Sequence, residues 1–288
     1  MSLSLRGALP DSLPIAQLTS LPICSSAFCP RPPTLWQRWW ARHDGIWLQG
    51  RWYCSLACFQ AGLYDVLKRL ALTESRKQAP NNRLPLGLIL LSRGDIDADQ
   101  LRHALERQRQ MKQGRIGEWL VKAGAVTEQQ VLTALGEQQA CPVFPGLEPR
   151  LIPSVYCWPQ RLVDRYGALP VFYTPAKARV YVGFLHQVDR RFLYALEQML
   201  GCGADPCIVA PKVYRQYVQL HKLSDAAETI EILEHQSGDE MTRTIGNYAH
   251  QVRAEGCKVI RCDDLLWVRL RPVHGSHVDF LFRRPLLG

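Results

Sequence analysis

The feature that most constrains this chain is a unit written twice, PLGLILLSRGDIDADQLRHALERQ at residues 85–108 and RIGEWLVKAGAVTEQQVLTALGEQ at residues 115–138. The two copies align without a gap, and apolar residues replace one another at Leu86/Ile116, Leu91/Val121, Ile96/Val126 and Leu101/Val131. The identical pairs are Gly87/Gly117, Leu90/Leu120, Gly94/Gly124, Gln100/Gln130, Ala104/Ala134, Leu105/Leu135 and Gln108/Gln138. A duplication of this kind predicts two equal supersecondary units that lie side by side.

Local signals predict the same structure in both copies. The segment IGEWLVKA favours a short amphipathic helix that ends at Gly124, because glycine tolerates the left-handed conformation of a helix C-terminus. Thr127 lies three residues before Gln130, and Asp97 lies three residues before Gln100, as in a capping box that starts a helix. Each unit is therefore expected to be a short helix, a glycine turn and a longer helix.

The length of 288 residues corresponds to about two domains, and the composition changes along the chain. The segments ALPVFY and RVYVGF flank TPAKA as in a hairpin, and two helical segments follow them. We predict an α+β fold: a tandem helical-hairpin repeat followed by a small α/β subdomain, with a small N-terminal zinc module and a small C-terminal α/β piece. The expected parts are a flexible 1–23, a four-cysteine module at 24–71, a central domain at 83–222 (tandem motif 83–140, α/β half 141–222), an acidic linker at 223–239 and an α/β piece at 240–288.

The recurring glycine near the start of each short helix suggests a ligand site. A glycine there lets a bound group approach the backbone, where unpaired amides and the helix dipole favour a phosphate. Arg115 adds a flat cation that can stack on a base, and neighbouring Leu or Ile side chains offer an apolar floor. The alternative is structural: Gly94 and Gly124 are only helix caps and the leucines only core. That alternative accounts less well for Gly87 and Gly117, since glycine inside a helix costs about 1 kcal/mol.

The tandem pattern of Arg-Leu-Gly, aliphatic pairs, glycine and Leu-x3-Leu-x2-Gln resembles the N-terminal domain of type II secretion and type IV pilus assembly ATPases. The segments YGALPV, RVYVGF and LEQMLGCGADPCIVAP also resemble the α/β half of that domain, so the resemblance covers about 83–222. In one branch of the family the domain binds cyclic di-GMP, with half of the ligand on each motif. The resemblance thus implies a nucleotide site made of Leu86, Gly87, Gly94, Gln108, Arg115, Ile116, Gly117, Gly124 and Gln138.

This chain departs from the family pattern at two places. The first copy has Pro85 where the family has arginine, with Arg83 close but out of register, and the spacer RQMKQG is one residue longer. Loss of one guanidinium removes about 1–3 kcal/mol of charge-assisted binding. Gln108 and Gln138 can equally be polar residues at helix ends without any contact to a ligand.

The motor of those ATPases is not encoded here. The chain contains no G-x-x-x-x-G-K-[ST] segment, so no phosphate-binding loop for ATP hydrolysis is expected. No H-E-x-x-H or G-x-S-x-G segment occurs either. The last piece, 240–288, weakly resembles the small α/β subdomain that precedes the motor in the family. We therefore expect a regulator or adaptor that is not an enzyme.

Four cysteines near the N-terminus predict a zinc site. Cys24 and Cys29 are separated by four residues, Cys54 and Cys58 by three, and the segment GIWLQGRWYC between the pairs suggests a hairpin. Four thiolates are a common structural zinc site, and bound zinc would stabilise a segment with little core of its own. The arrangement resembles a treble-clef or zinc-ribbon module. The alternative is four buried free thiols.

The remaining cysteines and the tryptophans each allow two interpretations. A second set could bind metal, but three of its members lie in apolar, strand-like segments, so we expect buried core thiols; the set is Cys202, Cys207, Cys257 and Cys262. The aromatic-rich segment could stack on nucleic acid, but we favour core packing; it holds Trp36, Trp39, Trp40, Trp47 and Trp52 among Arg31, Arg38, Arg42 and Arg51.

Composition narrows the partners. The net charge is +9, and residues 1–82 carry 9 Lys and Arg against 4 Asp and Glu, which suits an anionic partner or simply solubility. No apolar run is long enough to span a membrane, and the N-terminus does not resemble a secretory signal, so a cytoplasmic protein with reduced cysteines is expected. The leading hypothesis is a regulator that binds cyclic di-GMP or docks a secretion or pilus protein. The alternative is a zinc-dependent nucleic-acid-binding protein.

Overall fold

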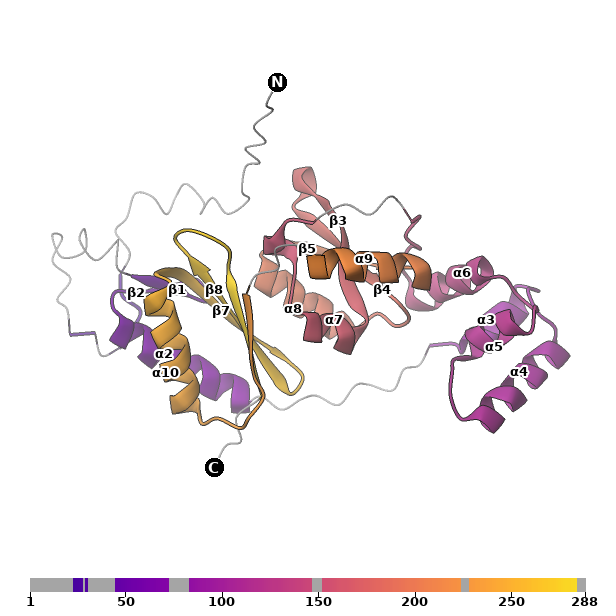
Figure 1. Ribbon diagram of the computed structural model, residues 1–288, viewed down its shortest axis with the longest axis horizontal. Helices are drawn as coiled ribbons and strands as arrows, with labels where there is room; N and C mark the ends of the chain where they lie inside the picture. Colours follow the sequence, from indigo (N-terminus) through magenta and orange to yellow (C-terminus); the bar gives the residue numbers. More distant parts are fainter. Residues whose placement is uncertain are drawn as a thin grey trace, which may run out of the picture.

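The computed structural model describes residues 23–27, 29–30, 45–72, 83–146, 152–223 and 228–283. Figure 1 shows three parts in a row: a large sheet with helices packed on it, a small sheet with its own helices, and a cluster made of helices alone. The fold is α+β, as the sequence predicts. Within the described residues, no helix is long and apolar enough to cross a membrane.

The described residues form the following helices and strands, given in chain order. The helices are α2 (Leu56–Leu72), α3 (Leu86–Ser92), α4 (Ala98–Met111), α5 (Ile116–Lys122), α6 (Glu128–Gln139), α7 (Gln160–Tyr166), α8 (Arg190–Leu200), α9 (Pro211–Leu223) and α10 (Gly238–Gln251). The strands are β1 (Ile46–Leu48), β2 (Arg51–Tyr53), β3 (Ala168–Thr174), β4 (Arg179–Phe184), β5 (Gly203–Ile208), β6 (Glu228–Ile232), β7 (Ala254–Cys262), β8 (Leu265–Pro272) and β9 (Val278–Arg283).

The large sheet joins the N-terminal cysteine module to the C-terminal piece. Its strand order is β2-β1-β7-β8-β9-β6, and β1 lies parallel to β7 with Leu48 opposite Cys257. The hairpin β1–β2 and the strands β7, β8 and β9 were expected from the sequence, but in two separate parts. The expected acidic linker is corrected as well: residues 228–232 form strand β6, parallel to β9, because Ile230 and Ile232 pack against the core of this sheet.

Both faces of the large sheet are covered. Helices α2 and α10 pack on one face, where Leu266 and Val268 of β8 meet Phe59 and Ile245. Trp267, between them on β8, points to the opposite face and joins the core of the α/β half. This double burial explains why LLWVRL lacks the polar alternation of a half-exposed strand.

The α/β half is built on a three-stranded sheet in the order β3-β4-β5. The predicted hairpin is confirmed: β3 and β4 pair antiparallel, with Thr174 opposite Arg179. Helix α8 begins at Asp189, whose carboxylate accepts hydrogen bonds from the amides of Arg191 and Phe192 at 2.9 Å. Its apolar face packs on this sheet, through Phe192 and Leu196.

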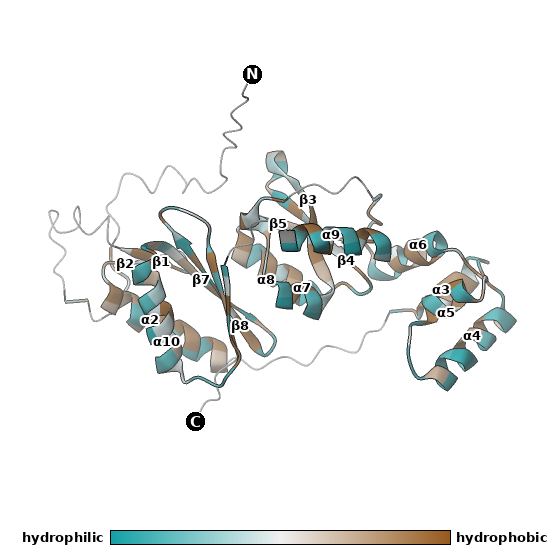
Figure 2. Ribbon diagram, in the orientation of Figure 1, coloured by the Kyte–Doolittle hydropathy of each residue, from teal (hydrophilic) through white to brown (hydrophobic). Residues whose placement is uncertain are grey.

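The tandem repeat forms the helices α3 to α6, and its predicted caps are confirmed. The capping boxes of Asp97 with Gln100 and of Thr127 with Gln130 are both present, and Gly94 and Gly124 have φ angles of +73° and +70°. The short helix of each copy packs mainly on the long helix of the other copy. Helix α4 is hydrophilic over most of its length, as Figure 2 shows. Ala104 is the one buried residue of this described helix.

A buried ion pair ties the large sheet to the α/β half. Both carboxylate oxygens of Asp279 on β9 accept hydrogen bonds from Arg269 on β8, each at 2.8 Å. The same guanidinium donates to the carbonyl oxygens of Val155 at 2.8 Å and Cys157 at 2.6 Å. The guanidinium of Arg269 therefore neutralises the buried Asp279 carboxylate within the large sheet, and its hydrogen bonds to Val155 and Cys157 connect that sheet to the α/β half.

Candidate ligand site and metal centre

A cavity of about 550 Å³ lies between the tandem repeat and the α/β half, and we call it the repeat cavity. Six of the nine residues predicted as a nucleotide site line it, namely Leu86, Gln108, Arg115, Ile116, Gly117 and Gln138. The remaining lining residues are Glu118, Val121, Lys122, Glu128, Val131, Leu132, Leu135, Leu185, His186 and Pro211. The walls are mostly apolar, with a few polar groups, which is the usual composition of a small-molecule site.

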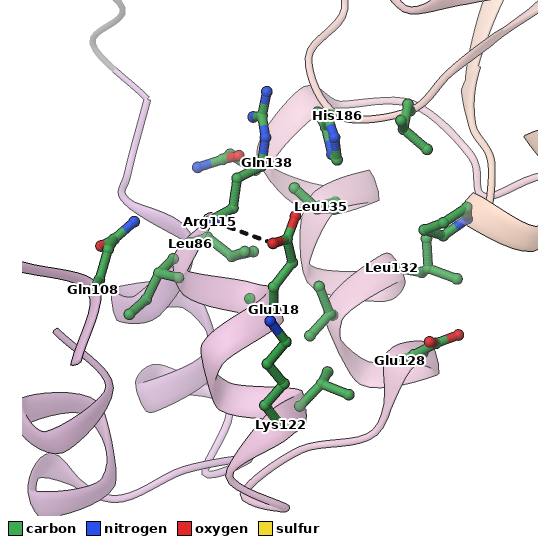
Figure 3. A pocket seen from close by; sticks show the side chains of 16 residues that line it. Leu86, Gln108, Arg115, Glu118, Lys122, Glu128, Leu132, Leu135, Gln138 and His186 are labelled. Atoms are coloured by element: carbon green, nitrogen blue, oxygen red, sulfur yellow. Dashed lines mark hydrogen bonds between the residues drawn. The ribbon is translucent and has the colours of Figure 1, made fainter. Parts of the chain in front are cut away.

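The polar groups of the repeat cavity gather at the start of α5. Figure 3 shows the side chains of Arg115, Glu118 and His186 around the same opening. The Glu118 carboxylate accepts a hydrogen bond from the backbone amide of Arg115 at 3.5 Å, so a carboxylate already lies at the helix N-terminus. Burial and the neighbouring Arg115 lower the pKa of the His186 imidazole, while Glu118 opposes the shift. The imidazole is therefore held in its neutral form near neutral pH.

The two closing glutamines occupy reciprocal positions. The Nε2 of Gln108, at the end of the first copy, donates to the carbonyl oxygen of Gly114, just before the second copy, at 2.9 Å. The Nε2 of Gln138 donates to the carbonyl oxygen of Leu84, just before the first copy, at 2.8 Å. Each glutamine thus fixes the start of the other repeat and also lines the repeat cavity.

The structure gives Gly87 and Gly117 a packing role that the sequence analysis underrated. A Cβ atom at Gly87 would lie 2.6 Å from Cδ1 of Leu101, and one at Gly117 would lie 2.9 Å from Cγ1 of Val131. Both distances are too short for two non-bonded carbon atoms. Glycine at these positions therefore lets the short helix of each copy lie close to the long helix of the same copy. Gly117 still lines the repeat cavity, whereas buried Gly87 does not.

The remaining predicted glycines lie away from the cavity. Gly94 and Gly124 form the turns between the helices of each copy, and space around the position of a Cβ atom is open at both. Neither glycine lines the repeat cavity. Their positive φ angles are the reason for glycine at these positions.

Arg83 does not replace the missing arginine of the first copy. Its guanidinium donates to the side-chain oxygen of Gln139, which also accepts a hydrogen bond from the amide of Val188 at 3.1 Å. Gln139 is buried, and Arg190 of α8 donates to its carbonyl oxygen at 3.4 Å. Arg83 therefore stabilises the junction between the repeat and the α/β half.

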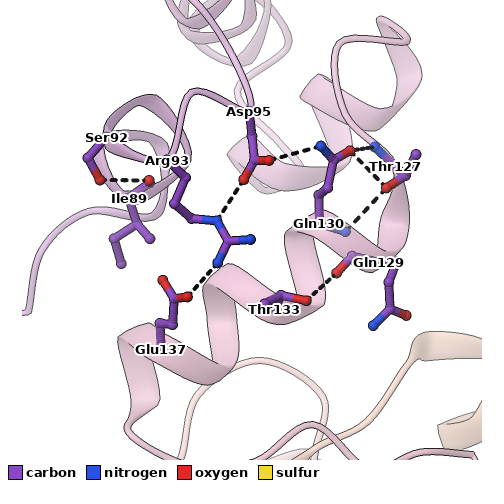
Figure 4. A network of polar contacts seen from close by, with 9 residues as sticks. All are labelled: Ile89, Ser92, Arg93, Asp95, Thr127, Gln129, Gln130, Thr133 and Glu137. Carbon is purple, nitrogen blue, oxygen red and sulfur yellow. Dashed lines mark hydrogen bonds and ion pairs between the residues drawn. The ribbon is translucent and has the colours of Figure 1, made fainter.

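A one-sided polar network adds to the contact between the two copies, as Figure 4 shows. Asp95 of the first copy accepts hydrogen bonds from Arg93 at 2.7 Å and from Gln130 of the second copy at 2.9 Å. Arg93 also pairs with Glu137. The second copy has Ala123 and Ala125 at the positions that match Arg93 and Asp95, so the charged Arg–Asp pair at the centre of this network comes from the first copy alone.

One wall of the repeat cavity contains residues that could not be predicted from the sequence of the repeat. Leu185 and His186 follow strand β4, and Pro211 begins α9, so all three come from the α/β half. Nothing in the repeat itself points to them. The only local signal was the proline at the first turn of a predicted helix, which marks a helix start and not a contact with another part.

Four cysteines form the candidate metal centre. The sulfur atoms of Cys24, Cys29, Cys54 and Cys58 all lie within 4.8 Å of one another. The Sγ atoms of Cys29 and Cys54 are 3.5 Å apart, and those of Cys54 and Cys58 are 4.0 Å apart. Tetrahedral zinc with bonds of about 2.3 Å would separate its sulfur ligands by about 3.8 Å, so the geometry fits.

The protonation chemistry of the four-cysteine cluster also fits a cation. Burial, together with the side-chain hydrogen bonds of Cys29 and Cys24, raises the pKa of Cys54 to about 12 when no cation is bound. Four thiolates at this spacing need a positive charge between them, which a divalent ion would supply. Cys54 and Cys58 flank the start of α2, so the cluster would hold the hairpin β1–β2 against that helix.

The second cysteine set is divided between two cores. Cys257 lies in the core under α2 and α10, whereas Cys207 and Cys262 lie in the core of the α/β half. Among the described residues, the only group of His, Cys, Asp and Glu suited to a metal is the N-terminal one. Burial raises the pKa of Cys207 to about 12, as for a core thiol. Trp52 is buried too, while Trp36, Trp39 and Trp40 lie outside the described residues together with Arg31, Arg38 and Arg42.

Comparison with known proteins gives partial structural likenesses. No protein-family description and no curated protein matches this chain. The structure of MshE with cdg has a TM-score of 0.39 and 23% identity, over 48% of this chain and 99% of that chain. Two crystal forms of the N-terminal domain of XpsE have TM-scores of 0.32 and 0.28 with 15% and 16% identity, over 51% of this chain and 98% of each. The likeness thus spans about half of the present chain.

Proposed function

We propose that this protein is a non-catalytic adaptor whose repeat cavity binds a cyclic dinucleotide, with cyclic di-GMP as the expected ligand. The observation that carries the proposal is the convergence of Arg115, Gln108 and Gln138 on one cavity, although they come from both copies of the repeat. The resemblance of the tandem motif to secretion and pilus ATPases supports the same ligand.

The chemistry of the cavity suits a purine nucleotide. Ile116, Val131 and Leu135 provide an apolar floor for a base or ribose, and Arg115 provides a flat cation above it. Lys122 lies at the end of α5, about two turns from Arg115, and can attract a phosphate. The neutral His186 ring adds a donor or an acceptor for a base edge.

The first copy offers a weaker half-site. Leu88 and Leu105 are exposed on α3 and α4, with 47% and 36% of their surface accessible, so an apolar face is open there too. Pro85 supplies no charge at the position of Arg115, and Arg83 is bound to Gln139. We expect an affinity about tenfold or more below that of a site with two guanidinium groups.

Calorimetric titration of the full chain with cyclic di-GMP tests this function. We expect saturable heat from the wild type and an affinity loss of about tenfold or more for Arg115→Ala. Glu118→Gln should bind more tightly, because it removes the carboxylate that competes with a phosphate at the start of α5. Arg102→Ala is the matched control, since Arg102 is exposed on α4 and forms an ion pair of 2.8 Å with nearby Asp99.

The outcomes separate the alternatives. Absence of heat from the wild type would reject ligand binding and leave only docking of a secretion or pilus protein. An equal loss in Arg115→Ala and Arg102→Ala would show attraction by net charge and not a site.

We further propose that the four-cysteine cluster binds zinc and has a structural role. Its support is the sulfur geometry, because the four Sγ atoms lie within 4.8 Å of one another, as the ligands of a single tetrahedral zinc would. The cluster lies in the part that contains the large sheet, at the opposite end of Figure 1 from the repeat, so zinc would stabilise that part and not contact the nucleotide.

A further inference from the structure

The repeat cavity is built mainly on the second copy of the duplicated unit. Eleven of the sixteen residues that line it lie between 115 and 138, two come from the first copy and three from the α/β half. The two from the first copy are Leu86 and Gln108, at the beginning and the end of that copy. The other first-copy residues that match cavity residues lie outside its walls. The cavity therefore lacks the symmetry of the sequence.

The α/β half closes the cavity over the second copy because it is bound directly to the end of α6. The chain that follows α6 pairs with β5, where the amide of Phe144 donates to the carbonyl oxygen of Ile208 at 2.7 Å. The amide of Val188 donates to the side-chain oxygen of Gln139, the last residue of α6, at 3.1 Å. The second bond holds the loop that carries His186 against the repeat, so this wall is fixed in place.

The matching face of the first copy is open. Arg102 lies where the second copy has Leu132; its side chain is 64% exposed and pairs with Asp99 at 2.8 Å, whereas Leu132 is buried. Leu105 is exposed, whereas its counterpart Leu135 packs against the core of the α/β half. A ligand on an open face keeps much of its contact with water, so it gains less from apolar burial than a ligand in an enclosed cavity.

We propose that the repeat cavity recognises a single purine nucleotide unit, so that a cyclic mononucleotide binds it nearly as well as a cyclic dinucleotide does. This inference rests on the proposed function and narrows the bound group to one base, one ribose and one phosphodiester. Arg115 supplies a cation for one phosphate, and Ile116 and Val131 supply an apolar surface for one base. The volume of about 550 Å³ lies in the lower half of the range of about 300–1,000 Å³ that is usual for small-molecule sites.

The second half of a cyclic dinucleotide would extend over the open face of the first copy. Pro85 offers no charge there, and the guanidinium of Arg83 is bound to Gln139. The second base and phosphate therefore add little to the affinity. A site that used both copies equally would behave differently, because loss of half the binding free energy changes a Kd of about 1 μM to about 1 mM.

Calorimetric titration of the full chain with cyclic GMP and, separately, with cyclic di-GMP tests this inference. Cyclic GMP is the matched probe, because its one base, one ribose and one phosphodiester make up half of cyclic di-GMP. We expect affinities within about tenfold of each other, with one cyclic GMP bound per chain. Saturation with cyclic GMP should also abolish the heat of cyclic di-GMP binding, since both ligands use the same cavity.

Two variants assign the bound unit to one copy. Arg115→Ala should weaken both ligands by the same factor, about tenfold or more, because both use the same cation. Leu105→Glu places a negative charge at an exposed position of the first copy, and it should weaken cyclic di-GMP no more than cyclic GMP. Circular dichroism checks the fold of each variant.

The outcomes distinguish this inference from the proposed function. Three results would overturn the inference and leave cyclic di-GMP binding intact: cyclic GMP weaker than cyclic di-GMP by more than tenfold, two cyclic GMP molecules per chain, or a selective loss of cyclic di-GMP binding in Leu105→Glu. Absence of heat with both ligands would reject the inference and the proposed function together.

Discussion

The Nε2 atom of Gln138 donates a hydrogen bond of 2.8 Å to the carbonyl oxygen of Leu84. Gln138 ends the second repeat and Leu84 precedes the first, so the bond joins the two ends of the duplicated segment. Gln108 and Gly114 form the matching bond at 2.9 Å. The two copies are therefore connected by an exchange of contacts, and neither copy is complete without the other.

The first prediction concerns these glutamines. Gln138→Ala should lower the free energy of unfolding by about 1 kcal/mol, because the carbonyl oxygen of Leu84 loses its side-chain donor. Gln108→Ala should have a similar effect through Gly114. Urea denaturation followed by circular dichroism measures both, and Gln110→Ala, at an exposed position of α4, is the control. If all three variants were equally stable, Gln108 and Gln138 would have no role in stabilising the repeat.

The second prediction concerns the close contact at Gly117. Gly117→Ala should destabilise the repeat by about 1–3 kcal/mol, since the added Cβ would lie 2.9 Å from Cγ1 of Val131. The double variant Gly117→Ala with Val131→Ala should recover part of that loss, because the smaller side chain makes room. Thermal unfolding of both variants and of Val131→Ala alone completes the cycle. Strictly additive effects would contradict the contact.

The third prediction concerns the metal centre. Zinc should be present in the purified wild type and lost in Cys54→Ser, with a lower unfolding temperature, because Cys54 is a buried member of the cluster. Cys202→Ser is the control, since Cys202 lies outside the cluster, and it should keep its zinc. Elemental analysis by mass spectrometry measures the content. Equal zinc in wild type and Cys54→Ser would reject the site.

The fourth prediction is a dependence of stability on pH. Burial raises the pKa of Asp279, but Arg269, with help from His277, outweighs it and holds the pKa at about 2, below the ordinary value of 3.8. Because the pKa is depressed in the folded state, this carboxylate stabilises the fold above pH 4. That contribution, about 2 kcal/mol, should be lost as the pH falls from about 4 to about 2.

Two variants check the ion pair. Asp279→Asn should destabilise the protein by about 3–5 kcal/mol at neutral pH, because it leaves the buried Arg269 charge unpaired. Arg269→Met with Asp279→Leu should recover much of this loss and show a smaller fall in urea midpoint between pH 4 and pH 2 than the wild type. The same acid sensitivity in wild type and double variant would assign the effect to other carboxylates.

Local features of this fold could be predicted from the sequence. The duplicated unit, its capping boxes at Asp97 and Thr127 and its turns at Gly94 and Gly124 follow from interactions within a few residues. The hairpin β3–β4 and the approach of the four cysteines also follow from short-range patterns. The residues that form these features lie close together in the chain, except for the two cysteine pairs, where Cys29 and Cys54 are 25 residues apart.

Contacts between distant segments could not be predicted in this way. The pairing of Leu48 with Cys257 leaves no local signal, because a short strand such as β1 can pair with any free edge. The wall that His186 adds to the repeat cavity depends on how two parts pack. The packing role of Gly87 became clear only with the position of Leu101.

The parallel pairing of β1 with β7 limits how this protein can be truncated. Removal of residues 45–72 would not release an intact remainder, because it would uncover one edge of β7 and the apolar surface beneath α2. The head and the tail of the chain must therefore be expressed together, and removal of the α/β half would in turn expose Trp267 on the other face of the sheet.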